Sequence, residues 1–171
     1  MALEDVSVVE AQIATLENGM ALDTFLIQET TLLNEKKPLD SEKKIARLQS
    51  KIEHADADGI EQKLSAKRAK SPASVLWCPP RVFINNTASD ACSLIEINGT
   101  DGVGFLHAVT RTMTKLRLNI VSAHVYTYGA RVVDVFYVTG ENGAKITDEQ
   151  RVRDIKSALL EAIDGSSPFS R

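Results

Sequence analysis

The C-terminal half of the chain carries the clearest pattern of hydrophobic and polar positions. Residues 92–98 are rich in β-branched and apolar side chains, which predicts a strand. From Gly104 onward the apolar residues recur at every third or fourth position, which is typical of one face of an amphipathic helix. The members of this stripe are Leu106, Val109, Met113 and Leu116.

Two further apolar stretches, residues 119–127 and 131–139, flank Tyr128-Gly129-Ala130 and predict a β-hairpin. Thr147 and Gln150 have the spacing of a capping box, so we expect a last helix to open there. Its apolar stripe consists of Val152, Ile155, Leu159 and Ile163.

The order of elements is therefore strand, helix, hairpin and helix, and residues 81–86 offer an extra strand in front. A helix that crosses over a sheet and leads into a hairpin gives a split βαβ arrangement. We therefore expect an α+β, ferredoxin-like fold with an antiparallel sheet and helices on one face.

Residues 8–29 contain a partial copy of the same pattern. The segment "VVEAQIATLENGMALDTFLIQE" aligns with "IVSAHVYTYGARVVDVFYVTGE" at residues 120–141. Small differences in turn length are needed for residues of the same type to match in the two segments. Ala11 then matches Ala123, and Ile13 matches Val125. After this hairpin, Asp40 or Ser41 is expected to cap a helix, and its apolar residues are Ile45, Leu48 and Ile52.

The repeat predicts a truncated unit at residues 1–60, a linker at 61–80, a complete unit at 81–165 and a flexible tail at 166–171. A unit that begins at its hairpin leaves one sheet edge and much of one face uncovered. We therefore expect the chain to be the C-terminal piece of a longer protein or to assemble with another copy.

Composition narrows the possible partners. A net charge of -3 over 171 residues argues against an electrostatic nucleic-acid binder, and the 131–139 strand lacks the exposed aromatic and basic residues of an RNA platform. No apolar run approaches a membrane span, and no secretory leader is recognisable. Cys78 and Cys92 lack metal-ligand spacing, so we expect reduced thiols, no metal site and a cytoplasmic protein.

The loop from Gly99 to Gly104 is the main candidate for chemistry. It lacks both the Gly-Lys-Ser/Thr ending of a Walker loop and the third small residue of a dinucleotide loop, where His107 stands. Backbone N–H groups at a helix start attract a carboxylate, and Asp101 can accept a hydrogen bond from an ammonium group. The alternative is that Asp101 only caps the helix and the glycines only form the turn.

Other polar residues are expected to be structural. His124 should be a half-buried sheet residue. His107 should face solvent, because it points away from the apolar stripe of its helix. Asp23 and Asp134 occupy matching strand positions, and each is expected to face solvent, an edge or a partner such as Arg131.

The segments "PRVFINNTAS", "IEINGTDGVGFLHAVT" and "LNIVSAHVYTYGARVVDVFYVT" resemble ACT domains, and more narrowly the last ACT domain of the bacterial PII uridylyltransferase/uridylyl-removing enzymes. Residues 18–25 resemble the preceding ACT domain of the same family. The resemblance covers nearly the whole chain and is weakest at 61–77.

This resemblance implies a regulatory module that senses L-glutamine and contains no catalytic residues or cofactor of its own. The effector is expected at the interface of paired ACT units, where the loop of one unit faces a strand of its neighbour. A purely structural or oligomerisation module without a ligand is the alternative, and a homodimer through ACT pairing is possible. The family's pattern assigns the effector site to Asp101, Gly102, Val103, Gly104, Phe105, Asn119 and Ile120.

Two features of the resemblance limit these expectations. The family's loop usually reads Asp-Arg-Pro-Gly-Leu, and its arginine and proline are replaced here by Gly102 and Val103, which predicts that glutamine binding is weaker than in the family or lost. In the family, a Mg²⁺-dependent nucleotidyltransferase domain adds UMP to the PII protein and a hydrolase domain removes it. The sequence contains neither the paired aspartates nor the His-Asp pair of those domains.

Overall fold

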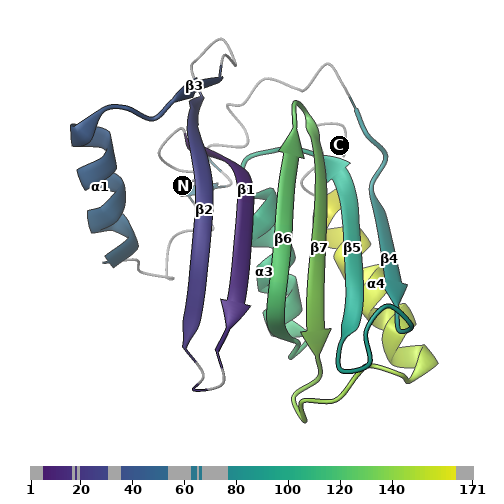
Figure 1. Cartoon of the computed structure of the whole chain (residues 1–171). Helices are drawn as coiled ribbons and strands as arrows, with labels where there is room; N and C mark the ends of the chain where they lie inside the picture. Colours follow the sequence, from purple (N-terminus) through teal and green to yellow (C-terminus); the bar gives the residue numbers. More distant parts are fainter. Residues whose placement is uncertain are drawn as a thin grey trace.

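The computed structural model describes residues 6–16, 18, 20–30, 36–53, 63–64, 66 and 77–164. These residues form one seven-stranded antiparallel sheet in the order β3-β2-β1-β6-β7-β5-β4, together with the helices α1, α3 and α4 (Figure 1). The predicted tail and most of the predicted linker lie outside the described residues. The elements are β1 (Val6–Thr15), β2 (Ala21–Thr30), β3 (Lys36–Pro38), α1 (Glu42–Glu53), β4 (Arg81–Asn85), β5 (Ser93–Thr100), α3 (Phe105–Lys115), β6 (Asn119–Tyr128), β7 (Arg131–Thr139) and α4 (Glu149–Asp164).

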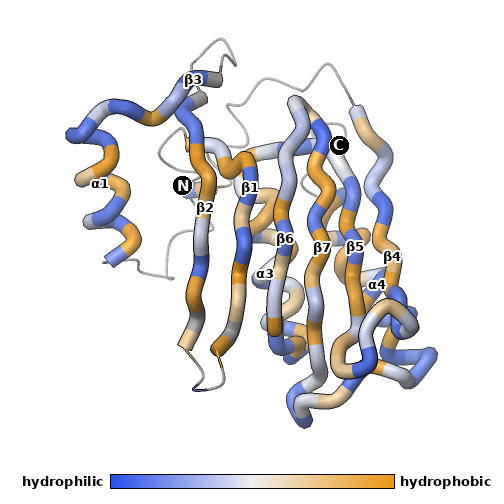
Figure 2. The backbone as a smooth tube through the Cα atoms, viewed as in Figure 1, coloured by the Kyte–Doolittle hydropathy of each residue, from blue (hydrophilic) through white to orange (hydrophobic). Residues whose placement is uncertain are grey.

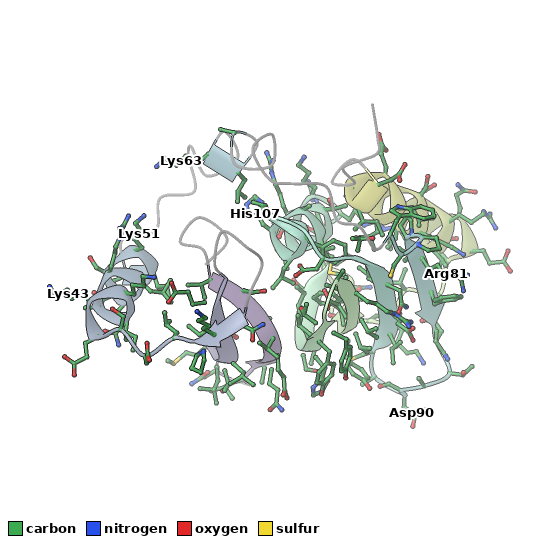
Figure 3. All side chains as sticks on the ribbon, turned by 90° about the horizontal axis from the view of Figure 1, so that it is seen from above. Lys43, Lys51, Lys63, Arg81, Asp90 and His107 are labelled. Atoms are coloured by element: carbon green, nitrogen blue, oxygen red, sulfur yellow. The ribbon has the colours of Figure 1, made fainter. Side chains whose placement is uncertain are left out.

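The C-terminal elements form the α+β, ferredoxin-like arrangement that the periodicity predicts. Helices α3 and α4 lie on one face of the β4–β7 part of the sheet, and β4 pairs with the outer edge of β5 (Figures 1 and 3). Burial alternates along β5 and β7, which carry many hydrophobic residues (Figure 2), so that one face of each strand packs against the helices. The fully buried core includes Ile95, Ile97, Val109, Met113, Phe136, Ile155 and Leu159.

The start of α4 differs from the predicted capping box. The side chain of Asp148, not Thr147, accepts the backbone N–H of Arg151 at 2.7 Å. Gln150 donates to Asp154 rather than back to the cap. A carboxylate one residue later satisfies the equivalent orphan N–H group, three residues beyond it, and adds a favourable interaction with the helix dipole, which explains why aspartate takes the cap.

The two hairpins have the same register at the positions that the sequence alignment matched. Ala11 faces Phe25 in the first hairpin as Ala123 faces Phe136 in the second. Ile13 likewise faces Asp23 as Val125 faces Asp134. Each hairpin also shifts register once, between Val8 and Glu10 in the first and between Ile120 and Ser122 in the second, which are matching places.

The two hairpins join through β1 and β6, which pair antiparallel and make the sheet continuous. Gln12 faces His124 at the centre of this pairing, and Ala11 faces Val125 as Ile13 faces Ala123. Because Ala11 matches Ala123 and Ile13 matches Val125, the two hairpins are related by a local two-fold axis at Gln12 and His124. The small side chain of Ala11 is fully buried at this junction.

The outer part of the first hairpin is less covered. Among the described residues, the outer edge of β2 pairs only with β3, at Gln28–Thr30, which leaves residues 21–27 without a strand partner on that side. Helix α1 stands beyond this edge (Figures 1 and 3), and an ion pair between Lys44 and Glu29 connects the two elements.

Candidate functional site

The loop between β5 and α3 is held in place from both ends. The backbone N–H of Asp101 donates to the carbonyl of Ala130 in the β6–β7 turn at 2.7 Å. Gly104 adopts φ 77° and ψ 19°, a left-handed conformation that glycine reaches without strain. The ring of Phe105 is buried and lies 3.2 Å from where a side chain on Gly99 would begin. These contacts explain why glycines stand at both ends of the loop.

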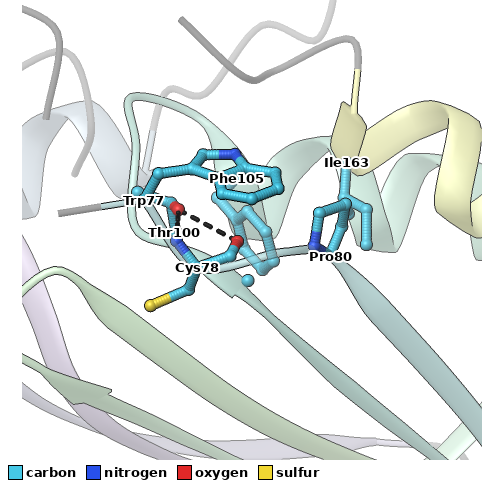
Figure 4. A pocket seen from close by; sticks show the side chains of 7 residues that line it. Trp77, Cys78, Pro80, Thr100, Phe105 and Ile163 are labelled. Carbon is cyan, nitrogen blue, oxygen red and sulfur yellow. Dashed lines mark hydrogen bonds between the residues drawn. The ribbon is translucent and has the colours of Figure 1, made fainter. Parts of the chain in front are cut away.

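The face of the loop toward α4 is closed. The hydroxyl of Thr100 donates to the carbonyl of Cys78 at 3.2 Å and accepts its N–H at 2.8 Å, which ties the incoming chain to the end of β5 (Figure 4). Trp77, Pro80, Phe105 and Ile163 complete the lining of the space beside this clamp. Its volume of about 10 Å³ holds at most one water molecule, so an amino acid has no room on this side.

Asn119 and Ile120 lie far from the loop within their own unit. They begin β6, whereas the Asp101 loop lies beside the turn that follows the end of β6 at Tyr128. Ten residues of strand correspond to about 30 Å, so the two groups are at opposite ends of the sheet. The side-chain amide of Asn119 donates to the carbonyl of Gly140 at 3.0 Å, a structural contact at that far end.

The β1–β6 pairing brings other residues to the loop's end of the sheet. The strands run antiparallel from the Glu10–Tyr126 pair, so the start of β1 lies alongside the end of β6 (Figure 1). The 112-residue offset between the hairpins makes Ser7 and Val8 the counterparts of Asn119 and Ile120. Ser7 and Val8 were not predicted from the sequence, although subtracting the offset from Asn119 and Ile120 identifies them.

Asp134 is the strongly perturbed titratable group near the loop. Its side chain is 1% exposed, and its Oδ1 atom has no hydrogen-bond partner. Burial raises the pKa of the Asp134 carboxyl to about 7; a hydrogen bond from the Tyr126 backbone opposes this rise, and the charge of Asp101 adds to it. The interaction with Asp101 places Asp134 within electrostatic range of the loop.

The expectation that Asp134 faces solvent, an edge or Arg131 is wrong. Asp134 lies on the same face of β7 as Val132, Phe136 and Val138, which are all buried in the core beneath the helices. Arg131 instead donates to Asn98 at 3.3 Å. The matching residue of the first hairpin, Asp23, is exposed, as expected.

The remaining candidates have structural surroundings. His124 is half-buried in the sheet opposite Gln12, which confirms its prediction. His107 is also half-buried, so it is more covered than expected. Cys78 and Cys92 are both free thiols.

The described residues contain neither of two general site types, a metal-binding cluster and a membrane-spanning helix. No group of three or more His, Cys, Asp and Glu side chains in that part of the chain is arranged to hold a metal ion. Within the same ranges, no helix combines the length and apolar character that a membrane crossing requires.

Known proteins match both the complete unit and the whole chain. The model of the ACR family N-terminal ACT domain matches residues 88–166. A bifunctional uridylyltransferase/uridylyl-removing enzyme of Rhodospirillum rubrum is 40% identical over 98% of the chain, and that of Gluconobacter oxydans is 38% identical over 95%. The corresponding enzyme of Azospirillum brasilense is 36% identical over 95% of the chain. No solved structure matches the chain at a significant level.

The chain spans only 17–18% of the length of these curated relatives. The relationship therefore concerns one part of those enzymes, and that part includes the segment with the ferredoxin-like fold. Residues 88–166 belong to the ACT domain family, and the chain is related along almost its whole length to one part of the bifunctional uridylyltransferase/uridylyl-removing enzymes.

Proposed function

We propose that this chain is a regulatory module whose effector is L-glutamine, bound between the 101–105 loop and the start of β1. The observation that carries the proposal is the antiparallel β1–β6 pairing, which brings Ser7 and Val8 to the end of the sheet where the loop lies. This position matches the expectation that the loop of one ACT unit faces a strand of its neighbour.

The chemistry of the loop suits a free amino acid. The backbone around Gly104 and Phe105 forms the start of α3, where N–H groups and the helix dipole favour a carboxylate. Asp101 supplies a negative charge for the ammonium group. The hydroxyl of Ser7 adds a donor and an acceptor from the neighbouring unit.

The loop also sets a limit on affinity. Gly102 and Val103 stand where the family has arginine and proline, so the unbound loop has more conformational freedom to lose and no guanidinium for the carboxylate. We therefore expect a dissociation constant in the millimolar range, which corresponds to about −4 kcal/mol of binding free energy.

The proposal extends to the organisation and the setting of the module. Residues 1–60 are a truncated ACT unit, 61–80 a linker, 81–165 a complete unit and 166–171 a tail. The parent protein is a cytoplasmic enzyme that transfers UMP to a PII protein and removes it, with Mg²⁺ in its nucleotidyltransferase domain, outside this chain. Glutamine changes the balance of these activities only if it binds one arrangement of the parent more tightly than another.

A structural module without a ligand is the second candidate. The departures at Gly102 and Val103 favour it, as does the β2 edge that has no described strand partner along residues 21–27. On this reading the ACT-type pairing of β1 with β6 serves to hold the chain together or to join it to further domains.

Isothermal titration with L-glutamine and L-glutamate distinguishes the two candidates. We expect saturable heat with glutamine only, and at least a tenfold weaker affinity in Asp101→Asn, since that variant loses the charge opposite the ammonium, worth about 1.4 kcal/mol or more. Asn119→Ala is the matched control at the far end of β6 and should bind like the unmodified chain. No heat with either amino acid at millimolar concentration would remove the sensing function and leave the structural one.

A further inference from the structure

The carboxyl of Asp134 is buried without compensation in the core of the complete unit. Its side chain is 1% exposed, and its Oδ1 atom has no hydrogen-bond partner among the described residues. Its direct neighbours in the sheet are Ile97 of β5 and Val125 of β6, which are both apolar. A carboxyl in such surroundings costs free energy, and the ionised form costs more than the neutral one. Packing alone therefore does not account for an acidic residue at this position.

The face of the sheet that carries Asp134 leads to the 101–105 loop. Strand β5 runs from Ile97, opposite Asp134, to Gly99 on the same face and then into the loop. The ring of Phe105 fills the space beside Gly99 and lies 3.2 Å from where a side chain there would begin. The path from Asp134 to the loop thus passes along hydrocarbon groups, which screen a charge much less than water does.

The charge at the loop end of this path belongs to Asp101. The backbone N–H of Asp101 is fixed to the carbonyl of Ala130 at 2.7 Å, at the turn from which β7 leads to Asp134. The negative charge of Asp101 disfavours a second negative charge on Asp134, and it contributes to the raised pKa of the Asp134 carboxyl. A cation that neutralises Asp101 therefore makes ionisation of Asp134 easier.

The other charged residues of the surrounding elements do not face Asp134. Glu96 of β5 and His124 of β6 alternate with the core positions of their strands, so they lie on the opposite face of the sheet. Arg131 of β7 donates to Asn98 instead. The buried stripes of α3 and α4 are entirely apolar. The titratable and charged residues outside these stripes are His107, Arg111 and Lys115 of α3 and Glu149, Arg151, Arg153, Asp154, Lys156, Glu161 and Asp164 of α4.

We propose that Asp134 acts on the amino-acid site through Asp101: it releases a proton to solvent when an ammonium group binds at Asp101, so binding strengthens as the pH rises. The inference rests on the proposed function, because it needs an amino acid at the loop. The positive charge that the ammonium brings to Asp101 is balanced by the positive charge that leaves with the proton. Asp134 thereby makes the site sensitive to pH without touching the ligand.

The direction and the size of the effect follow from linkage. A ligand that releases a proton binds more tightly where protons are scarce, so the affinity rises with pH. The charge of Asp101 is the smallest of the three influences on the Asp134 carboxyl, so only a fraction of a proton leaves. We expect the affinity to rise about two- to fivefold between pH 6 and pH 8. The carboxylate of the amino acid acts in the opposite direction, but N–H groups at the start of α3 offset its charge.

Isothermal titration of the full chain with L-glutamine, in buffers of different ionisation enthalpy, counts the released protons. At pH 7 we expect a fraction of a proton from the unmodified chain and none from Asp134→Asn, whose affinity should no longer vary with pH. Asp23→Asn is the matched control at the exposed position of the first hairpin and should release the same fraction as the unmodified chain. Glutaramate, which is L-glutamine without its amino group, should release no proton.

The outcomes separate this inference from the proposed function. Saturable glutamine binding without proton release, or equal release with glutaramate, would overturn the inference and leave the proposed function standing. Absence of glutamine binding would remove both.

A titration of the ligand-free chain tests the coupling of the two carboxyls by itself. Carbon-13 NMR of the Asp134 carboxyl follows its ionisation between pH 5 and pH 9. In Asp101→Asn the carboxyl should titrate at a lower pH than in the unmodified chain, because the opposing charge is gone. Asp23→Asn should leave the midpoint where it is. An unmoved midpoint in Asp101→Asn would overturn the inference even if glutamine binds.

Discussion

At the scale of single residues, the two hairpins place the same amino acid in opposite environments. Asp23 and Asp134 occupy matching strand positions, yet Asp23 is exposed and Asp134 is 1% exposed under the helices. The difference arises because Asp134 lies on the face of β7 that packs against the helices, whereas β2 stands to one side of α3 and α4 (Figure 1). Burial without a full set of partners makes the charged form of Asp134 unfavourable.

The stability of the chain should therefore decrease as the pH rises toward 8. The pKa of Asp134 is about 7 in the folded chain and 3.8 when unfolded, so the folded state binds more protons between these values. The contribution of the protonated Asp134 carboxyl to the free energy of unfolding is complete below about pH 4 and is lost as the pH rises through 7. Between pH 5 and pH 8 we expect the free energy of unfolding to fall by about 2 kcal/mol from this group.

Urea titrations at several pH values measure this effect. Asp134→Asn should flatten the dependence between pH 5 and pH 8, because the amide does not ionise. Asp23→Asn, at the matching exposed position, should leave the dependence unchanged. An unaltered slope in Asp134→Asn would contradict the assignment of this titration to Asp134.

At the scale of elements, a buried polar network fastens α4 to the far edge of the sheet. The hydroxyl of Ser93 donates to Asn86 Oδ1 at 2.6 Å and accepts the backbone N–H of Ile146 at 2.9 Å. The amide of Asn86 in turn donates to the carbonyl of Ile146 at 2.9 Å. Lys145 adds hydrogen bonds to the carbonyls of Asn86 and Ser89. The network joins the β4–β5 loop to the segment that leads into α4.

Removal of the Ser93 hydroxyl should loosen this connection. Ser93→Ala leaves the buried N–H of Ile146 and an oxygen of Asn86 without their partner, which costs about 1–3 kcal/mol of folding free energy. Thermal unfolding followed by circular dichroism measures the loss. Ser122→Ala, a half-buried serine of β6, is the control and should change stability by less than about 0.5 kcal/mol. Equal effects of the two variants would show that the network adds nothing.

The elements themselves were largely predictable from local pattern. The strand at residues 131–139 and the helix opening after Gly104 follow from strand alternation and helical spacing, which depend on neighbouring residues alone. The cap of α4 was misassigned because Thr147 and Asp148 are both good caps and only the backbone geometry chooses between them. Asp134 and Phe136 are two residues apart on β7 and share a face, so the burial of Asp134 could have been predicted from the sequence. Exposure was expected instead, because burying a carboxylate costs free energy.

At the scale of the whole molecule, the decisive contact joins residues more than a hundred positions apart. Local propensity carries no information about the pairing of Glu10 with Tyr126, because nothing in either strand specifies its neighbour. The alignment of the two hairpins and the resemblance to paired ACT units predicted that two units meet, but not which strands pair or in which register. Consequently the loop could be proposed from the sequence, whereas the strand that we propose to face it was first sought at Asn119 and not at Ser7.

Mapping of amide chemical shifts during an L-glutamine titration tests the central claim most directly. The claim is that the β1–β6 pairing forms one amino-acid site from the 101–105 loop and the start of β1. We predict saturable shift changes at Ser7, Val8 and residues 101–105, with Asn119 and Ile120 unaffected. Changes confined to Asn119 and Ile120, or none at millimolar glutamine, would contradict the account.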